Sequence, residues 1–149
     1  MLLTHAADYA VRVMIHLAAA PEEERRSLSA LAEATGAPSS FLSKVLQTLS
    51  RAGLVLSRRG SDGGFEISSM GRRANLRDVI EAIDGPLFLN TCVGPSEACE
   101  RSGTCPAHPV WVKAQDSVTA ILEATSITAL AAEAAATPAP VPEPASRKN

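Results

Sequence analysis

Three cysteines stand close together in the segment CVGPSEACERSGTCPAH, and they are the residues of this chain best suited to chemistry. Cys92, Cys99 and Cys105 are separated by six and five residues, and His108 follows after two more. Thiolates are soft ligands for iron, zinc and iron–sulfur clusters. The segment lacks the paired CxxC knuckles of a typical zinc ribbon. Three thiolates with an incomplete fourth position fit an iron–sulfur cluster whose remaining site is labile, as a sensor requires.

Two other interpretations of the thiols stay open on the residues alone. Zinc held by three thiolates and His108 is one, because these side chains form a complete ligand set for zinc. Three free thiols without a ligand role are the other, although such cysteines are usually buried in a core and these lie in a polar segment. The odd number of cysteines and the absence of a secretory signal pattern predict a reduced, cytoplasmic protein.

The overall composition favours a small helical domain with uneven charge. Of 149 residues, 46% are hydrophobic and only 3% aromatic, which favours a core of Ala, Leu, Val and Ile. The 14 basic and 16 acidic residues argue against a histone-like polyanion binder. However, residues 40–77 carry a net charge of +5 and residues 81–149 a net charge of −4, so the first segment is a candidate polyanion surface. No apolar run reaches the about 18 residues of a membrane span, and no membrane partner is expected.

Hydrophobic periodicity predicts three helices at the start of the chain. The first begins at the N-cap Thr4 and is unbroken until Pro21, and the second, SLSALAEAT, is stopped by Gly36. The third, FLSKVLQTLSRAG, ends at Gly53. Two short helices joined by a tight glycine-containing turn are typical of a helix-turn-helix, although an ordinary helical hairpin has the same pattern. The inward side chains of the third helix are expected to be Phe41 or Leu42, with Val45, Leu46 and Leu49.

A basic β-hairpin is predicted next. LVLS and FEIS have the pattern of strands, with Phe65 and Ile67 on one face, and the loop RRGSDGG joins them. A helix-turn-helix followed by a basic hairpin is the winged-helix arrangement, in which the second helix of the pair enters the major groove and the wing meets phosphates or the minor groove. The expected DNA contacts are polar residues of the third helix and arginines and glycines of the wing: Ser39, Ser40, Ser43, Lys44, Gln47, Arg58, Arg59, Gly60, Gly63 and Gly64.

The rest of the chain is expected to hold one more short helix and a long one. Asn75 caps the amphipathic helix LRDVIEAID, and the apolar stripe from His108 to about Thr125 predicts a helix that packs on a second copy of itself or folds back on its own domain. A last turn precedes a Pro- and Ala-rich tail that is expected to be disordered. The predicted parts are a winged helix over 1–84, the cysteine segment over 85–107, a dimerisation helix and last turn over 108–136, and the tail over 137–149.

Several segments together resemble the IscR/NsrR family of bacterial iron–sulfur winged-helix regulators, the Rrf-two family. They are MLLTHAADYAVRVMIHLA, SSFLSKVLQTLSRAGLV, RRGSDGGFEIS, LRDVIEAIDG and the cysteine segment, so the resemblance covers about residues 1–133. It implies a mainly α winged helix-turn-helix fold and a homodimeric transcription regulator, usually a repressor, of palindromic double-stranded DNA. It also implies that Cys92, Cys99 and Cys105 ligate a 2Fe–2S or 4Fe–4S cluster whose state changes the affinity for DNA.

The fourth ligand divides this family, and the chain offers both types. IscR-like members use a histidine shortly after the third cysteine, where His108 stands, and the NsrR-like branch can use an acid in the partner subunit's first helix, where Asp8 stands. Asp8 also has a simpler explanation, because the helix dipole favours an acid in a first turn. Six residues separate the first two cysteines where close IscR relatives have five, and Ser43 replaces an acid of IscR. This chain is therefore not expected to bind the operators that IscR binds.

The expected function is therefore a DNA-binding regulator whose cluster senses nitric oxide, redox state or iron supply. The alternative is a cluster-free regulator that senses through thiols or zinc with the same DNA-binding surface. A small iron–sulfur electron carrier is a third possibility, but it would leave Arg58 and Arg59 without a purpose. No enzyme is expected, because the sequence shows no paired carboxylates, nucleophile–base arrangement or phosphate loop.

Overall fold

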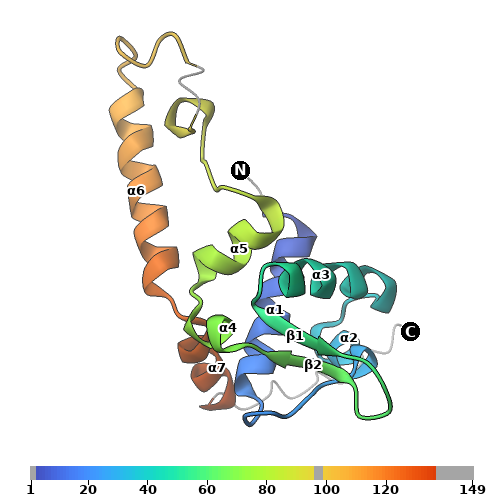
Figure 1. The fold of residues 1–149 in the computed structure, drawn as a ribbon. Coiled ribbons are helices and arrows are strands. Elements are labelled where there is room, and N and C mark those ends of the chain that lie inside the picture. Colours follow the sequence, from blue (N-terminus) through green and yellow to red (C-terminus); the bar gives the residue numbers. More distant parts are fainter. Residues whose placement is uncertain (1–2, 96–98, 137–149) are drawn as a thin grey trace, which may run out of the picture.

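The computed structural model describes residues 3–95 and 99–136. They form a globular part from which one long helix, α6, projects with the cysteine segment at its far end (Figure 1). The elements in chain order are α1 His5–Ala19, α2 Leu28–Thr35, α3 Ser39–Arg51, β1 Val55–Arg58, β2 Gly64–Ile67, α4 Ser69–Arg73, α5 Leu76–Asp84, the 3-10 helix η1 Thr91–Val93, α6 His108–Ala124 and α7 Ile127–Ala136. The predicted tail, residues 137–149, lies outside the described residues.

Thr4, Gly36 and Asn75 cap helices as the sequence predicts, and Ser27 is an N-cap that the sequence analysis does not name. Thr4 and Ser27 accept hydrogen bonds from backbone N–H groups in the first turns of α1 and α2. Gly36 ends α2 in the left-handed conformation, with φ of 70°. Asn75 and Asp78 form a reciprocal capping box at the start of α5. The predicted helices are therefore confirmed, whereas α4 is not predicted, because its five residues SMGRR show no apolar periodicity.

The core lies between α1 and the helices around it. α1 packs against α2, α3, α5 and α7 (Figure 1). Of the two candidates in the first turn of α3, Leu42 is fully buried and Phe41 is 37% exposed. The mainly α fold with a helix-turn-helix and a two-stranded antiparallel wing is confirmed. The buried apolar side chains that α1 and α3 contribute are Ala7, Ala10, Val13, Met14, Leu17, Leu42, Val45, Leu46 and Leu49.

The chain returns to this core after α6. The Ile127 backbone N–H donates to the Ala74 carbonyl at 3.0 Å, and the Leu76 N–H donates to the Thr125 carbonyl at 2.9 Å. The Ile127 side chain is fully buried in the main core, and α7 packs along α1. The C-terminal end of α6 is thereby joined to the globular part through α5 and α7. Among the described residues, no helix is long and apolar enough to cross a membrane.

Ile127→Ala is expected to lower the free energy of unfolding by about 2–5 kcal/mol, because it leaves a cavity under α7. Leu56→Ala is a suitable control, since Leu56 is an exposed aliphatic side chain on the wing; its change should stay within about 0.5 kcal/mol. Urea unfolding of both variants at one protein concentration measures the difference. Equal stabilities would mean that α7 does not belong to the folded core in solution.

Candidate functional site

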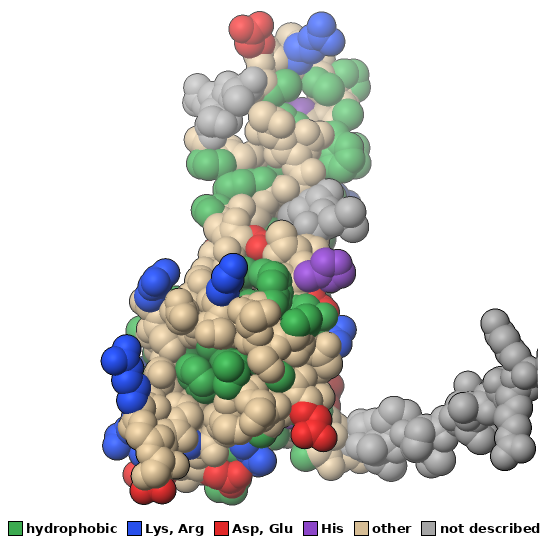
Figure 2. All heavy atoms as spheres, turned by 90° about the vertical axis from the view of Figure 1, so that its right-hand side faces the viewer, with side chains coloured by type: hydrophobic (Ala, Val, Ile, Leu, Met, Phe, Trp, Pro, Cys, Tyr) green, Lys and Arg blue, Asp and Glu red, His purple; other side chains and the backbone are tan. Residues whose placement is uncertain are grey.

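The exposed face of α3 carries the polar side chains that the sequence singles out. Ser39, Ser40, Lys44 and Gln47 are exposed and Ser43 is half-buried, while the opposite face of the helix enters the core. The first turn has no side-chain cap, because the N-cap position is Pro38. Figure 2 shows Lys and Arg side chains gathered along one edge of the globular part. The structure thus presents the predicted residues of α3 together on one accessible surface.

The wing is an antiparallel hairpin with the predicted arginines at its tip. Val55 pairs with Ile67 and Arg58 with Gly64, so the turn comprises residues 59–63. Arg58 and Arg59 are both exposed. Gly63 is required by the hairpin itself, because a Cβ there would lie 2.6 Å from the Arg58 carbonyl oxygen. Gly60 and Gly64 have φ of 112° and 142°, a conformation that favours glycine, so the backbone explains the wing glycines whether or not they approach a phosphate.

One face of the wing is covered by the loop between α1 and α2, which the sequence does not reveal. Arg26 forms a two-way backbone bridge with Phe65, with N···O distances of 2.9 Å. The neighbouring Arg25 donates from Nη1 to the Asp62 carbonyl at 3.0 Å. The alternation of Phe65 and Ile67 predicts an outward Glu66, but this carboxylate is buried, with Arg25 Nε at 3.6 Å and Arg58 Nε at 3.8 Å. Glu66 therefore draws Arg58 toward the wing, whereas Arg59 has no side-chain partner among the described residues.

The three cysteines and His108 line one cleft beside the far end of α6. The cleft has a volume of about 360 Å³, far above the roughly 10–15 Å³ that one water needs. Cys92 reaches it from η1, whose first N–H donates to the Asn90 side chain. Cys99 and Cys105 reach it from a series of turns, in which the Cys105 N–H donates to the Arg101 carbonyl at 2.8 Å. The cleft therefore brings together thiols that lie up to 13 residues apart in the chain.

His108 begins α6 at the mouth of this cleft. Its backbone N–H donates to the Cys105 carbonyl at 3.1 Å, which joins the helix to the last thiol. Its Nδ1 is buried without a hydrogen-bond partner, and such an orphaned atom is costly unless another group binds it. Among the residues described, no three His, Cys, Asp or Glu side chains already converge as a metal-binding group. The donor set thus fits a thiophilic metal group in its chemistry and in its placement around one cleft, without converging on one point.

Asp8 lies elsewhere in the chain's own fold. Its carboxylate pairs with Arg12 one turn along α1, at 2.9 Å, and both side chains are about half exposed. It is absent from the residues that line the cysteine cleft. Within one subunit, the structure brings His108 and not Asp8 to the three thiols.

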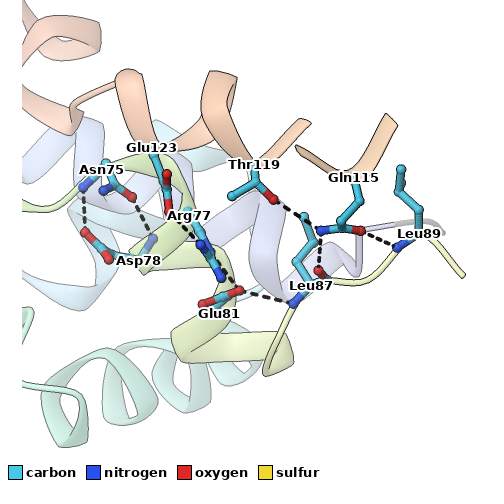
Figure 3. A network of polar contacts seen from close by, with 9 residues as sticks. All are labelled: Asn75, Arg77, Asp78, Glu81, Leu87, Leu89, Gln115, Thr119 and Glu123. Carbon is cyan, nitrogen blue, oxygen red and sulfur yellow. Dashed lines mark hydrogen bonds and ion pairs between the residues drawn. The ribbon is translucent and has the colours of Figure 1, made fainter. Parts of the chain in front are cut away.

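A polar network joins the cysteine segment to α5 and α6 (Figure 3). Gln115 of α6 is its centre: its Oε1 accepts from the Leu89 N–H and its Nε2 donates to the Leu87 carbonyl, both at 2.9 Å. Leu87 itself is buried between α1, α5 and α6. Its N–H donates to Glu81 Oε1 at 3.2 Å. Gln115 therefore fixes the backbone that leads to Cys92.

Arg77 extends the same network from α5 to the other half of α6 (Figure 3). Its guanidinium donates to Glu81 at 3.0 Å and also bonds Glu123. The hydrogen bond to Glu81, followed by that to Glu123, raises the pKa of Arg77. The network thus ties α6 to the globular part at two levels.

Gln115→Leu is expected to speed exchange of the Leu89 backbone amide about fivefold, because the amide loses its acceptor, a hydrogen bond of about 1 kcal/mol. Ser117→Ala is the matched control, since within the described part of the chain the Ser117 hydroxyl bonds only its own helix, at the Lys113 carbonyl. Hydrogen exchange followed by NMR reports both variants. An unchanged Leu89 rate would show that Gln115 does not hold this segment.

The comparison with protein families decides the class of this chain. A family model for Rrf2, described as an iron-dependent transcriptional regulator, matches residues 3–133. The chain belongs to the Rrf2 family. Two relatives from Mycobacterium tuberculosis, Rv1287 of strain H37Rv and MT1325 of strain CDC 1551, are each 34% identical over 127 residues, which is 85% of this chain and 79% of theirs. Their names describe them as HTH-type transcriptional regulators.

Solved structures agree with membership of the Rrf2 family. CymR, the global cysteine regulator of B. subtilis, has a TM-score of 0.74 and 26% identity, covering 89% of this chain and 98% of its own. T. potens IscR has a TM-score of 0.71 and 25% identity, covering 90% and 88%. This Rrf2 protein is therefore a DNA-binding transcriptional regulator of the winged-helix type and not an enzyme.

Three residues of this Rrf2 chain gain a structural role that the sequence interpretation missed. Gln115 could have been found, because it falls within the apolar stripe of α6, where a polar side chain needs a partner. Glu66 and Arg25 could not, because their contact depends on how a distant loop folds over the wing.

Proposed function

We propose that this Rrf2 protein is a cytoplasmic repressor whose DNA affinity is controlled by an iron–sulfur cluster bound to Cys92, Cys99 and Cys105, with His108 as the fourth ligand. One observation carries the proposal: the three thiols and His108, with its orphaned Nδ1, line a single cleft. Thiolates are the usual ligands of such clusters, and a single histidine among them leaves one weaker position.

The chain's own residues perform distinct tasks in this proposal. When bound, the cluster supplies a link between the thiolates that nitric oxide, oxygen or iron shortage can break. Loss of the bond to Cys92 would release the Leu87–Leu89 backbone that precedes it. Gln115 joins that backbone to α6 by two hydrogen bonds. A coupling of about 1–3 kcal/mol would change operator affinity by roughly five- to 150-fold.

The DNA-binding surface proposed for the same protein is the one predicted from sequence. Ser40, Ser43 and Gln47 supply hydroxyl and amide groups for base edges, and Ser39 and Lys44 reach phosphates from the start of α3. Arg58 and Arg59 contact the DNA backbone or minor groove, with Gly60, Gly63 and Gly64 shaping the wing. The exposure of the α3 and wing side chains supports these roles.

We propose that a second copy of the chain packs against α6. Along α6 none of the described side chains is fully buried, and Val110 and Ile121 are each 65% exposed, with Trp111 and Val112 exposed between them. In Figure 2 hydrophobic side chains crowd the narrow upper part of the molecule, where α6 and the cysteine segment lie. A homodimer through this helix would cover these side chains and present two α3 helices to a palindromic operator.

Zinc is the second candidate for the cleft, because three thiolates and one imidazole complete a tetrahedral zinc site. A zinc regulator would use the same division of the chain: a DNA-binding part over 1–84, a metal-binding segment over 85–107, a dimerisation part over 108–136 and a tail over 137–149. Protein purified without oxygen should contain iron and acid-labile sulfide and absorb visible light through sulfur-to-iron charge transfer. Zinc in place of iron and sulfide would overturn the cluster proposal and favour the zinc regulator.

His108→Ala is expected to keep the three thiolate ligands but to shift the visible spectrum and hasten cluster loss in air, because it removes the fourth donor. Asp8→Ala should leave the spectrum as in the unchanged protein, since Asp8 pairs with Arg12 away from the cleft. Spectra of the two variants, prepared side by side without oxygen, check this assignment. The reverse pattern would identify Asp8 of a partner subunit as the ligand.

A further inference from the structure

One side chain at the DNA-binding face of α3 is neither polar nor buried. Phe41 is 37% exposed although it belongs to the first turn of the helix, where its N–H donates to the Pro38 carbonyl. Helical spacing places it beside Lys44, three residues further on, at the border of the polar face. An exposed phenylalanine in such a position costs solvation unless it contacts something apolar when DNA binds.

The ring of Phe41 is held in place from behind. It lies edge-on to Tyr9 of α1, with ring centroids 5.8 Å apart and an interplanar angle of 69°. Arg12 lies over the Tyr9 ring at 5.8 Å and is anchored by Asp8 at 2.9 Å. Because few rotamers are available to a ring packed in this way, Phe41 is presented to a ligand with little loss of side-chain entropy.

The major groove offers one apolar group on its base edges, the C5-methyl of thymine. Residues in the first turn of a recognition helix are those that reach base edges in helix-turn-helix proteins. We propose that Phe41 determines specificity by packing on the methyl group of one thymine in each half-site. A ring without donors or acceptors cannot satisfy the amino and carbonyl groups that the other base pairs present, so the same contact disfavours them.

The other large exposed apolar side chains in the described residues do not compete for this role. None of them lies in α3: Leu3 precedes α1, Leu56 lies on strand β1 of the wing, Met70 belongs to α4, and α6 holds Val110, Trp111, Val112 and Ile121. The neighbours of Phe41 on that face are the hydroxyls, the amide and the ammonium group already placed against DNA. Phe41 is thus the apolar member of a surface whose remaining members suit bases and phosphates.

Selection of binding sites from random double-stranded DNA tests the proposal without a known operator. The unchanged protein, Phe41→Ala and the control Met70→Ala, which is also exposed and apolar, are each selected in the cluster state that binds DNA more tightly. We expect one thymine in each half-site to lose its preference with Phe41→Ala alone, while the other positions stay the same.

Deoxyuridine at that thymine then removes only the methyl group. Binding by the unchanged protein should weaken about fourfold per half-site, the effect of burying about one methyl group, and binding by Phe41→Ala should not respond. Phe41→Leu, which keeps an apolar side chain, should recover part of the response. The same selected sequence for Phe41→Ala, an equal loss of affinity on all sequences, or indifference of the unchanged protein to deoxyuridine would each overturn the proposal.

Discussion

Cys105→Ser protein purified without oxygen is expected to lack iron, sulfide and visible absorption, and to bind DNA with the affinity of the unchanged protein after cluster removal. The reason is that Cys105 is one of three thiols lining the cleft, and its backbone also joins the turn at Arg101 to the start of α6. The difference in affinity from the cluster-loaded protein should be roughly five- to 150-fold. Iron and sulfide analysis with DNA titration measures both effects.

Ser102→Ala provides the matched control, because Ser102 lines the same cleft without a thiol. It should retain the cluster and its regulation. Once the cluster has been removed from Ser102→Ala, the two variants should unfold at the same temperature, since neither side chain belongs to the core. Full iron and sulfide content in Cys105→Ser would remove this residue from the ligand set.

Arg59→Ala is expected to weaken binding to all DNA sequences and to make the dependence of log K on log salt less steep by about 0.9 per subunit, as loss of one phosphate contact does. Arg59 is exposed at the wing tip and its side chain has no partner among the residues described. Arg58→Ala should change the slope less, because the Arg58 guanidinium already forms an ion pair with Glu66. Titrations at several salt concentrations measure the slopes.

Lys113→Ala controls for the loss of a positive charge alone, since Lys113 is exposed on α6, away from α3 and the wing. Its slope should equal that of the unchanged protein. If Arg59→Ala has that slope too, the wing tip does not contact phosphates.

The parts of the fold that the sequence predicts are those determined by local residues. Thr4 and Asn75 cap their helices because a cap needs only a side-chain oxygen and the next turn. The hairpin follows from two short strands around glycines, and Gly63 is fixed by a contact within its own turn. The proximity of the cysteines was also predictable, because they lie within 13 residues of one another in the chain.

The parts that sequence does not predict depend on contacts between distant segments. Glu66 is buried because a loop 40 residues earlier covers the wing. Gln115 acquires its role because the Leu87 backbone passes beside α6, 28 residues before it. The burial of Leu42 in place of Phe41 required the position of α1, since both residues lie in the same helical turn. Periodicity alone does not determine such choices.

The central claim is that the state of the cysteine cleft controls the affinity of the α3 and wing surface for DNA. One protein preparation, made without oxygen and divided in two, tests it most directly: half keeps its cluster, half is stripped by a chelator, and both are titrated with a selected DNA site at one salt concentration. We predict dissociation constants that differ at least fivefold, the lower limit of a coupling of about 1 kcal/mol. Equal constants for two samples that differ in iron and sulfide content would contradict the account.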